Sequence, residues 1–213
     1  MNPPDLLRKA VRHFRSRRMR LFETVFAITP DTRVLDVGGS PSIWEFLTVQ
    51  PHLTIVNFPT ALETGAKSVE CVAGDGRLLP FQDAAFDIAF SNSVIEHVGN
   101  RVNQQRFAEE IARVARSYWV QTPNRGFPIE LHLMLPFIHY LPKAWQRAII
   151  ERFTVWELLV RPNEAQRSFY VEHFLNDVKL LDKSNLQRLF PDAKILSERV
   201  LGVAKSLIAI RTG

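Results

Sequence analysis

The sequence predicts an α/β protein in which a mostly parallel β-sheet is flanked by helices. Three observations support this prediction. From Arg33 onwards, short apolar segments of strand length alternate with longer segments of helical periodicity. The first strand-like segment ends abruptly at Gly38-Gly39, which permits a tight turn. The last two segments, 193–201 and 203–210, are joined at Leu201-Gly202 without an intervening helix, so they must run antiparallel.

The first 30 residues are expected to form a basic amphipathic helix ahead of the main domain, 31–213. Apolar residues recur at intervals of three and four between residues 5 and 28. Of the 27 Lys and Arg and 22 Asp and Glu residues, the first 20 positions hold seven basic residues and one acidic residue, Asp5. This segment therefore carries +6 and the remainder −1. Residues 5–20 could bind anionic lipid or RNA, or the helix could cap the domain with a solvated basic face.

Five strands and one long helix are expected between residues 33 and 121. The strands are 34–37, 53–57, 68–73, 86–90 and 118–121, and the helix covers 103–115. A further helix is expected to begin after the two glycines, because residues 43–47 read as its first turns. In such an order the strands are parallel, and ligands bind outside their carboxyl ends.

Residues 122–181 break this alternation and are rich in aromatic, proline and histidine residues. A stretch of this length inside a compact domain requires helices of its own, so we interpret it as an inserted cap. A helix at 183–190, ended by Pro191, leads into the closing hairpin. Several large cap side chains would line either an apolar pocket or the core of the cap itself: Phe127, Met134, Phe137, Trp145 and Trp156.

The composition is that of an ordinary globular protein, with 46% apolar and 23% charged residues. No apolar run reaches the roughly 18 to 20 residues that span a bilayer. The first eight residues lack the charged-then-apolar order of a secretion signal. The single Cys71 cannot form an internal disulfide and is expected as a small core residue. We therefore expect a cytoplasmic location, with peripheral membrane contact through residues 5–20 as an option.

Several segments, in order, resemble the class I S-adenosylmethionine-dependent methyltransferases, particularly the broad bacterial group that includes quinone-biosynthesis enzymes. Val34–Gly39 resembles the family's first motif, and Ala73–Phe81 its adenine-side motif. Phe86–Val98 is similar to its fourth-strand motif, and the terminal hairpin to its reversed last strand. The resemblance covers about 30–121 and 183–210. It implies a Rossmann-like seven-stranded, mostly parallel sheet with an antiparallel last strand, and S-adenosyl-L-methionine as cofactor.

The resemblance also implies roles for individual residues. Asp36 would lie near the amino group of the cofactor, with capping of the following turn as the alternative. Gly38 and Gly39 would let the methionyl part lie against backbone. Asp75 could accept a hydrogen bond from the adenine amino group, while Gly76 keeps the approach open. The other residues expected at the cofactor are Leu79, Ser91 and Asn92, although core packing is an equal alternative for Leu79 and its neighbour Phe81.

The chain departs from the family pattern at two places. The glycine loop continues as Ser40-Pro41-Ser42, and Pro41 suits the first position of a helix. The second departure is Asn57, where the family places Asp or Glu to hold both ribose hydroxyls. An amide can bond one hydroxyl but lacks the charge-assisted pair. The difference is on the order of 1–2 kcal/mol, so we expect weaker cofactor binding.

The acceptor side is expected to contain a histidine base. Alignment of the acceptor can contribute roughly 7–11 kcal/mol, but a hydroxyl acceptor must also lose its proton, and histidine is suited to accept it. His97, just beyond the fourth strand, is the candidate, with a histidine hydrogen-bonded at a helix start as the alternative. Glu96-His97 pairs help bind metal in some quinone-type relatives, but the sequence shows no clear ligand cluster, so no metal is expected. Asn124, Glu130 and His132 are candidates for substrate contact.

The sequence therefore predicts an S-adenosylmethionine-dependent methyltransferase that acts on a small or lipid-like acceptor, at oxygen. Two alternatives remain. The first is an RNA methyltransferase that uses the arginine-rich helix as an electrostatic grip, although a main domain of −1 is not the spread of basic charge that such a surface requires. The second is a non-catalytic binding module that retains the fold, for which Asn57 is the best support. The oligomeric state is left open.

Overall fold

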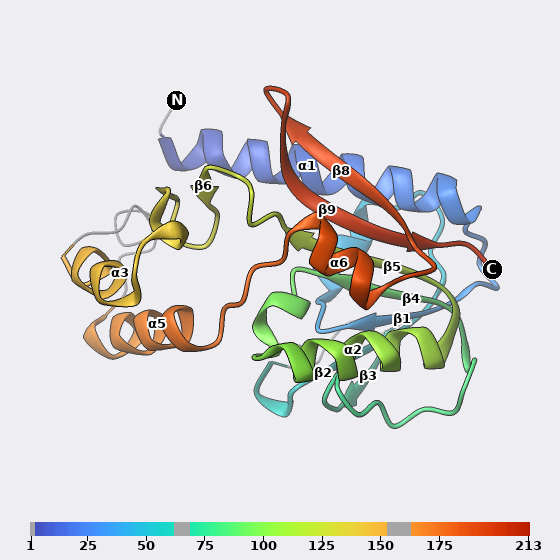
Figure 1. Cartoon of the computed structure of the whole chain (residues 1–213). Helices are drawn as coiled ribbons and strands as arrows, with labels where there is room; N and C mark the ends of the chain where they lie inside the picture. The colour runs from blue at the N-terminus through green and yellow to red at the C-terminus, as the bar shows by residue number, and fades with distance from the viewer. Residues whose placement is uncertain (1–2, 62–68, 153–162) are drawn as a thin grey trace.

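The computed structural model describes residues 3–61, 69–152 and 163–213 (Figure 1). Its centre is a seven-stranded sheet with the order β3-β2-β1-β4-β5-β9-β8. The strands are β1 Arg33–Val37, β2 His52–Asn57, β3 Glu70–Ala73, β4 Phe86–Asn92, β5 Ala115–Pro123, β8 Lys194–Val200 and β9 Val203–Arg211. The first five are parallel, and β9 runs antiparallel to both β5 and β8. The predicted α/β fold with an antiparallel last strand is thus confirmed.

The turn between β8 and β9 has the backbone geometry that a two-residue hairpin requires. Leu201 has φ 48° and Gly202 has φ 82°, so both central residues are left-handed. This twist matches that of the flanking strands, which is why two-residue hairpins favour it. Glycine adopts the conformation freely, whereas leucine adopts it at some cost. The hairpin expected from the sequence at these two residues is therefore confirmed.

Helices α2 (Arg101–Val114) and α6 (Lys183–Leu189) cover one face of the sheet, in front of it in Figure 1. The side chain of Asn100 caps α2 by accepting a hydrogen bond from the Asn103 amide. Phe107, Ile111 and Val114 recur at helical spacing and are fully buried against the sheet. This face matches the helix predicted for residues 103–115, extended by two residues at its start.

The other face is covered by the N-terminal helix α1 (Pro3–Phe26), which runs behind the sheet in Figure 1. Met19 and Phe22 are fully buried there. The Phe22 ring lies 5.1 Å from that of Phe90 and 5.8 Å from that of Trp119, between ring centroids. Such edge-on contacts are favourable for aromatic rings. The second half of α1 therefore caps the domain, as one of the two sequence interpretations proposed.

The helix expected after the glycine loop is largely absent, and this prediction was wrong. Residues Pro41–Phe46 form a short 3-10 helix, η1, and the chain becomes extended at Leu47. Pro41 favours the start of a helical turn, but Pro51 restricts the residue before it to extended backbone, so little room remains for a longer helix. Helix α1 contacts η1 and occupies this face of the sheet instead.

One arginine of the basic helix is part of the interior. Arg18 is 6% exposed and forms an ion pair with Glu198 at 2.6 Å. Its guanidinium also donates hydrogen bonds to the side-chain oxygens of Asn92 and Gln121. The expectation of a wholly solvated basic face is therefore wrong at Arg18. Among the α1 side chains whose burial the structure describes, five basic ones are exposed: Lys9, Arg12, Arg15, Arg17 and Arg20.

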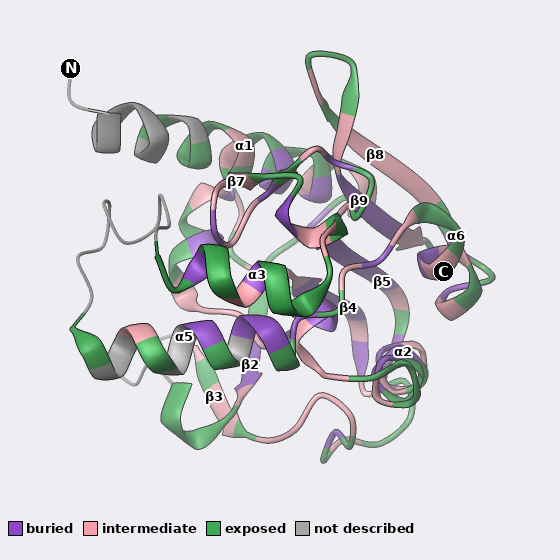
Figure 2. Ribbon diagram, turned by 60° about the vertical axis from the view of Figure 1, so that its left-hand side comes forward, coloured by how far each residue is buried: buried purple, intermediate pink, exposed green. Residues whose placement is uncertain are grey.

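The inserted region forms its own small subdomain. It contains β6 (Ile129–Glu130), β7 (Leu135–Pro136), the 3-10 helix η4 (Ile138–Tyr140), α3 (Lys143–Ile150) and α5 (Glu164–Asn176). Helices α3 and α5 lie side by side, and buried residues occur on both (Figure 2). Their core consists of Leu133, Ile138, Ile150, Val171, Phe174, Leu175 and Val178.

The prediction that five large cap side chains line a pocket or the cap core was wrong for two of them. Phe137 and Trp145 are 59% and 65% exposed, and the cap core is built mainly from aliphatic side chains. Phe127 is buried and Met134 is half-buried, while Trp156 lies outside the described residues. Among the described helices, none combines the length and apolar character needed to cross a bilayer.

Candidate functional site

A small pocket opens at the carboxyl ends of β1, β2 and β3, where the fold places its ligands. Its volume is about 140 Å³. We call it the glycine-loop pocket. Its lining residues include Gly38, Asn57, Asp75, Gly76 and His97. Five of the residues predicted from sequence thus meet at one place, although they come from segments up to 59 positions apart.

The two glycines of the loop are required for different reasons. Gly38 has φ +78°, which side-chain-bearing residues rarely adopt, and a Cβ there would lie 2.7 Å from Cγ2 of Val94. A Cβ at Gly39 would lie 1.9 Å from Oδ2 of Asp36. The loop therefore passes directly over a buried carboxyl group, and only glycine leaves room for it.

That carboxyl group is fully buried, since Asp36 has no exposed surface. Its Oδ2 accepts a hydrogen bond of 2.7 Å from the indole Nε1 of Trp44, whereas Oδ1 has no partner among the described residues. Burial raises the pKa of Asp36 to about 7, and the Trp44 hydrogen bond opposes this only in part. A buried acceptor without a donor is costly. Oδ1 of Asp36 is therefore the atom that would accept the predicted hydrogen bond from the cofactor amino group.

Asn57 and Asp75 line the pocket but already have partners within the chain. The amide of Asn57 donates to the carbonyl of Gly39 at 3.2 Å, and its oxygen accepts from the Phe58 amide. The carboxylate of Asp75 forms a bidentate ion pair with Arg77, with a shortest distance of 2.6 Å. The hydrogen bond from Arg77 lowers the pKa of Asp75 despite partial burial. Both contacts predicted for the cofactor would therefore share or replace these bonds.

Three other residues predicted at the cofactor pack inside the protein, and Gly76 has a packing role as well. A Cβ at Gly76 would lie 2.7 Å from the Phe107 ring, so this glycine permits close packing of α2 in addition to bordering the pocket. Ser91 is fully buried and donates to the carbonyl of Val37 at 3.1 Å. The Asn92 oxygen accepts from Arg18. Leu79 belongs to the core and is not part of the pocket lining.

The pocket nevertheless fits the cofactor that the fold family uses. Three glycines border the pocket: Gly38, Gly74 and Gly76. The polar residues Asn57 and Asp75 line the same pocket. The unpartnered Oδ1 of Asp36 lies beneath the loop as a latent acceptor. These residues would hold S-adenosylmethionine through its hydroxyl and amino groups, which are hydrogen-bond donors.

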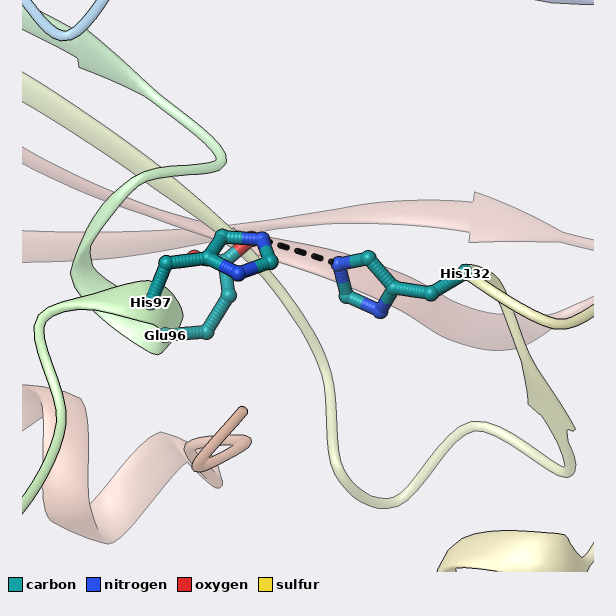
Figure 3. Close-up of side chains that lie close together, drawn as sticks. All are labelled: Glu96, His97 and His132. Carbon is teal, nitrogen blue, oxygen red and sulfur yellow. Dashed lines mark hydrogen bonds and ion pairs between the residues drawn. The ribbon is translucent and has the colours of Figure 1, made fainter. Parts of the chain in front are cut away.

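A cluster of two histidines and two glutamates lies next to the pocket, and Figure 3 shows three of its members, Glu96, His97 and His132. Glu96 and His97 belong to the 3-10 helix η3 (Ile95–His97), which follows β4. His132 comes from the turn between β6 and β7. Its Nε2 lies 3.1 Å from Nε2 of His97, and the two rings are almost perpendicular. The cap therefore brings its histidine against the predicted base.

Glu130 determines the proton arrangement of this pair. Its Oε1 lies 2.6 Å from Nδ1 of His132, and its Oε2 accepts the Leu133 amide. Because Nδ1 faces a carboxylate, it carries a proton. Burial lowers the pKa of His132, but the hydrogen bond and charge of Glu130 outweigh burial and raise that pKa above its ordinary value. When the His132 ring is charged, its Nε2 carries the proton that lies between the two Nε2 atoms. When the His132 ring is neutral, Nε2 of His97 carries that proton.

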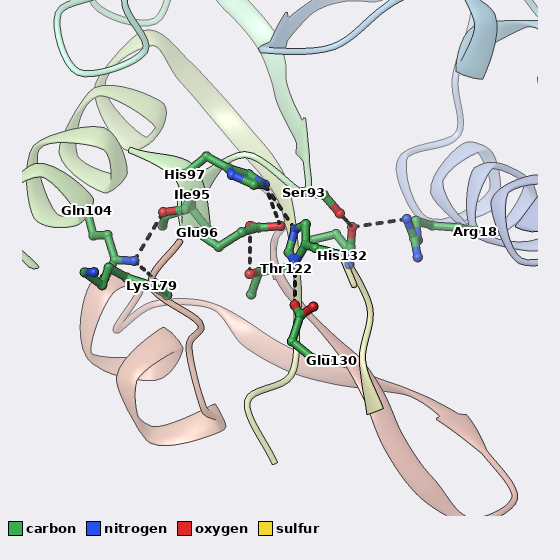
Figure 4. Close-up of polar contacts among 11 residues, drawn as sticks. Arg18, Ser93, Ile95, Glu96, His97, Gln104, Thr122, Glu130, His132 and Lys179 are labelled. Carbon is green, nitrogen blue, oxygen red and sulfur yellow. Dashed lines mark hydrogen bonds and ion pairs between the residues drawn. The ribbon is translucent and has the colours of Figure 1, made fainter. Parts of the chain in front are cut away.

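Glu96 is the second buried carboxyl group of the site (Figure 4). Its Oε2 accepts a hydrogen bond from the Thr122 hydroxyl at 2.9 Å. Its Oε1 has no hydrogen-bond partner among the described residues and lies 4.0 Å from Nε2 of His97. Burial raises the pKa of Glu96 to about 7, mainly because the charged form is desolvated.

Glu96, His97 and His132 are also the described residues best placed to hold a metal ion. Each offers one ligand atom, and these atoms lie within 4.8 Å of one another. The expectation of no metal relied on the lack of a ligand cluster in the sequence. The missing member was His132, which stands 35 positions after His97 and is brought there by the cap fold. The absence of a metal stays a prediction.

Asn124, the remaining candidate for substrate contact, stabilises the first residues of the cap through hydrogen bonds. Its amide donates to the Ala204 carbonyl at 2.8 Å, and its oxygen accepts the Gly126 amide. These bonds tie the chain after β5 to strand β9. The structure thus places Glu130 and His132 at the site, while Asn124 supports the loop that leads to them.

Comparisons with known proteins agree with this geometry. Residues 44–118 match the family model described as a methyltransferase domain. An uncharacterised methyltransferase of Mycobacterium sp. (strain JLS) is 31% identical over 106 residues, which is 45% of this chain and 40% of that protein. The matched segment thus covers less than half of the length of this relative.

Solved structures with low sequence identity share the fold along nearly the whole chain. A putative methyltransferase in complex with the Trm112 methyltransferase activator of Haloferax volcanii gives a TM-score of 0.59 at 15% identity, covering 94% of this chain and 89% of that one. Magnesium protoporphyrin IX methyltransferase from Synechocystis PCC 6803 with bound SAH gives 0.55 at 10% identity, covering 92% and 81%.

Proposed function

We propose that this chain, which belongs to the class I S-adenosylmethionine-dependent methyltransferases, transfers a methyl group to an oxygen atom of a small or lipid-like acceptor. The observation that carries the proposal is the chain of contacts from Glu130 through His132 to His97, which ends beside the glycine-loop pocket. An amine acceptor that is already neutral needs no base, whereas a hydroxyl group must lose its proton. An oriented imidazole pair supports the second case.

S-adenosylmethionine, when bound, supplies a methyl group on a positively charged sulfur, which is a strong electrophile. The protein's own residues have a different task. His97 is partly exposed at the pocket and accepts the acceptor's proton. His132 lies against His97 and fixes its ring, while the carboxylate of Glu130 stabilises the positive charge that the pair acquires. This is the general logic of a base oriented by a third group.

Glu96 affects the charge of the two imidazoles. Because its carboxyl group is fully buried and its pKa is raised to about 7, it is partly protonated near neutral pH. Removal of a proton from the acceptor increases the positive charge on the imidazoles, and ionised Glu96 beside them would stabilise that charge. The base and its two buried carboxyl neighbours therefore act as one coupled group.

A non-catalytic binding module is the second candidate, and one observation favours it. Asn57 and Asp75 are engaged in bonds within the chain at the positions where the cofactor would be held. A site that must first break internal bonds binds its ligand less tightly. The proposal of an enzyme accordingly requires that S-adenosylmethionine binds in spite of these bonds.

Calorimetry with S-adenosylmethionine and S-adenosylhomocysteine tests the cofactor site first, with adenosine triphosphate as a control for unspecific nucleotide binding. We expect both sulfur compounds to bind and the triphosphate not to. Release of S-adenosylhomocysteine is then followed with matched phenol, alcohol and amine acceptors carrying the same apolar body. Preference for the hydroxyl compounds supports oxygen methylation. Preference for amines would refute it, and binding without turnover on any acceptor would favour the binding module.

A further inference from the structure

A second and larger cavity lies between the main domain and the cap. Its volume is about 590 Å³, and it is lined by the start of α2, by α6 and by the cap helices α3 and α5. Five of its lining residues are basic: Arg101, Arg125, Lys143, Lys179 and Arg188. No acidic residue in the described part of the chain lines it. We call this feature the basic cavity.

The positive charges of the basic cavity are not neutralised within the described chain. None of the five side chains forms an ion pair there. Lys143 donates to the Gln146 amide at 3.3 Å and Lys179 to the Asn176 carbonyl at 2.7 Å, both of which are uncharged acceptors. Asp182 interacts electrostatically with Arg125, but the pKa of Asp182 is lowered first by the hydrogen bond from the Asn185 amide and only last by Arg125. Like charges gathered in one concave site repel one another unless an anion joins them.

Arg125 is held in place by its backbone. Its amide donates to the Leu181 carbonyl at 2.8 Å. Its carbonyl accepts hydrogen bonds from Nε2 of His139 at 3.0 Å and from the Tyr140 hydroxyl at 2.8 Å. Three bonds at one residue of an irregular segment fix the point from which the guanidinium extends, which reduces the entropy lost when it binds a ligand.

Lys179 is fixed in a similar way and is linked to the histidine cluster. Its amide donates to the Glu96 carbonyl at 2.8 Å, and its own carbonyl accepts from the Gln104 side chain at 2.9 Å (Figure 4). The same Gln104 amide donates to the Ile95 carbonyl. Arg101 stands in the first turn of α2, where the helix itself contributes partial positive charge.

Part of the cavity lining is apolar. This apolar wall is formed by Phe174, Val178, Leu180, Leu181 and Leu189. Apart from the five basic residues, the other lining residues are polar: Asn100, Gln104, Gln105, His139, Gln146 and Asn185. The Phe174 ring also lies 6.3 Å from the His132 ring, between centroids, so the apolar wall continues to the histidine cluster. A cavity lined by both basic side chains and aliphatic or aromatic groups matches a ligand that carries an anionic group on an apolar body.

We propose that the basic cavity binds an amphiphilic anion, in which a phosphate or carboxylate group is attached to an apolar body. This site needs neither the cofactor nor methyl transfer, so it goes beyond the proposed function and can fail independently of it. Guanidinium groups bind both kinds of anion in bidentate fashion. The concave shape and the apolar wall favour such a small ligand over the extended phosphate backbone of RNA.

The test measures binding to the full chain in the absence of S-adenosylmethionine, by calorimetry at low salt. Dodecyl phosphate and dodecanoate are the probes, below their micelle concentrations. Inorganic phosphate tests the contribution of the apolar body, and dodecyltrimethylammonium tests the sign of the charge. We expect both anionic amphiphiles to bind at least tenfold more tightly than inorganic phosphate, and the cationic one not to bind. The ratio of the two anionic probes decides between phosphate and carboxylate as the preferred group.

Variants assign the binding to the cavity. Arg125→Gln removes a guanidinium but leaves the backbone bonds of that residue intact, and it should weaken dodecyl phosphate binding by about tenfold or more, as expected for a charge-assisted pair. Arg106→Gln is the matched control, because Arg106 is exposed on α2 and does not line the cavity. The control should retain affinity within about twofold, since an exposed charge outside the site contributes little.

Three results would overturn the proposal. One is equal loss of affinity in the Arg106 and Arg125 variants, which would mean unspecific attraction to positive charge. Another is equal binding of the cationic amphiphile, which would mean that only the apolar wall is used. The third is tighter binding of a short single-stranded RNA that is itself weakened by Arg125→Gln, which would make the surface a nucleic-acid site.

Discussion

Asp36 and Glu96 are two buried carboxyl groups near the ends of neighbouring strands, β1 and β4. In each, one oxygen accepts a hydrogen bond, from Trp44 or from Thr122, and the other has no hydrogen-bond partner among the described residues. Burial raises the pKa of both to about 7. Their surroundings differ, because Asp36 lies beneath a glycine loop whereas Glu96 lies beside two imidazoles. Equal burial thus leads to different chemistry, and the neighbours decide which.

Replacement of His97, which lies beside Glu96, should give the largest change in turnover. Such a change would show that the reaction takes place near Glu96 and not near Asp36. His97→Ala is expected to lower kcat by about 10²- to 10⁴-fold, the range in which a general base contributes. Affinity for S-adenosylmethionine should stay nearly unchanged, because a base acts on the acceptor. The measurement is release of S-adenosylhomocysteine with the best acceptor, together with calorimetry. His52→Ala, at an exposed position on β2, is the control. Unaltered turnover in His97→Ala would remove it as the base.

The Asp36 region should show its effect in stability. Its folded pKa of about 7 lies above that of an unfolded aspartate, so the native state holds the proton more tightly. The resulting stabilisation is fully present below the unfolded pKa and is lost as pH rises through about 7. Between about pH 5 and pH 8 this loss amounts to roughly 2–3 kcal/mol in the free energy of unfolding.

Asp36→Asn cannot ionise and should lose this pH dependence, which urea unfolding at several pH values would measure. Glu96 retains its own dependence of the same sign in this variant, since its pKa is raised in the same way. The double variant with Glu96→Gln should therefore lose both carboxyl contributions and retain the smaller dependence due to His132, whose pKa is also raised. If Asp36→Asn unfolds with the pH dependence of the unaltered protein, the carboxyl group is not buried as described.

Glu130→Gln should have a smaller effect that separates positioning from base catalysis. The amide oxygen still accepts a hydrogen bond from Nδ1 of His132, but the negative charge is gone. The pKa of His132 then falls, because the charge of Glu130 is what raises it against burial. We expect kcat to decrease by about tenfold and its pH profile to move to lower pH. A decrease without any shift of the profile would indicate that Glu130 has only a structural role.

Treatment with a chelator is expected to leave turnover unchanged. The positions of Glu96, His97 and His132 would also suit a divalent ion. Under the proposed mechanism the imidazoles exchange protons and need no metal. Turnover is measured before and after treatment with ethylenediaminetetraacetate. Loss of activity that Zn²⁺ or Mg²⁺ restores would replace the base mechanism by a metal-dependent one.

Features with a local cause were predictable from the sequence. The burial of Phe107, Ile111 and Val114 follows from helical spacing, and the last hairpin follows from Leu201-Gly202. The parallel direction of the first five strands follows because strands that alternate with helices form a parallel sheet. The glycine loop was found for the same reason, since only glycine fits a position with φ +78°.

Features that depend on distant partners were not predictable. Nothing near His132 indicates that its ring meets His97, because the contact is made by the path of the cap. The sequence of an amphipathic helix does not show whether an acidic residue far along the chain will approach its polar side. Arg18 was therefore predicted to be solvated, although it pairs with Glu198. Exposed aromatic residues such as Trp145 also break the rule that large apolar side chains are buried.

The anchoring of Arg18 has a consequence for biosynthesis. Its partner Glu198 lies 180 positions further along the chain. A ribosome adding about 5 to 20 residues per second needs roughly 10 to 40 s to cover that distance. Throughout this interval Arg18 lacks its ion-pair partner, although the strands that carry Phe90 and Trp119, against which Phe22 packs, are made earlier. The docking of α1 therefore takes place in two stages, because its aromatic contacts can form well before the ion pair that anchors Arg18.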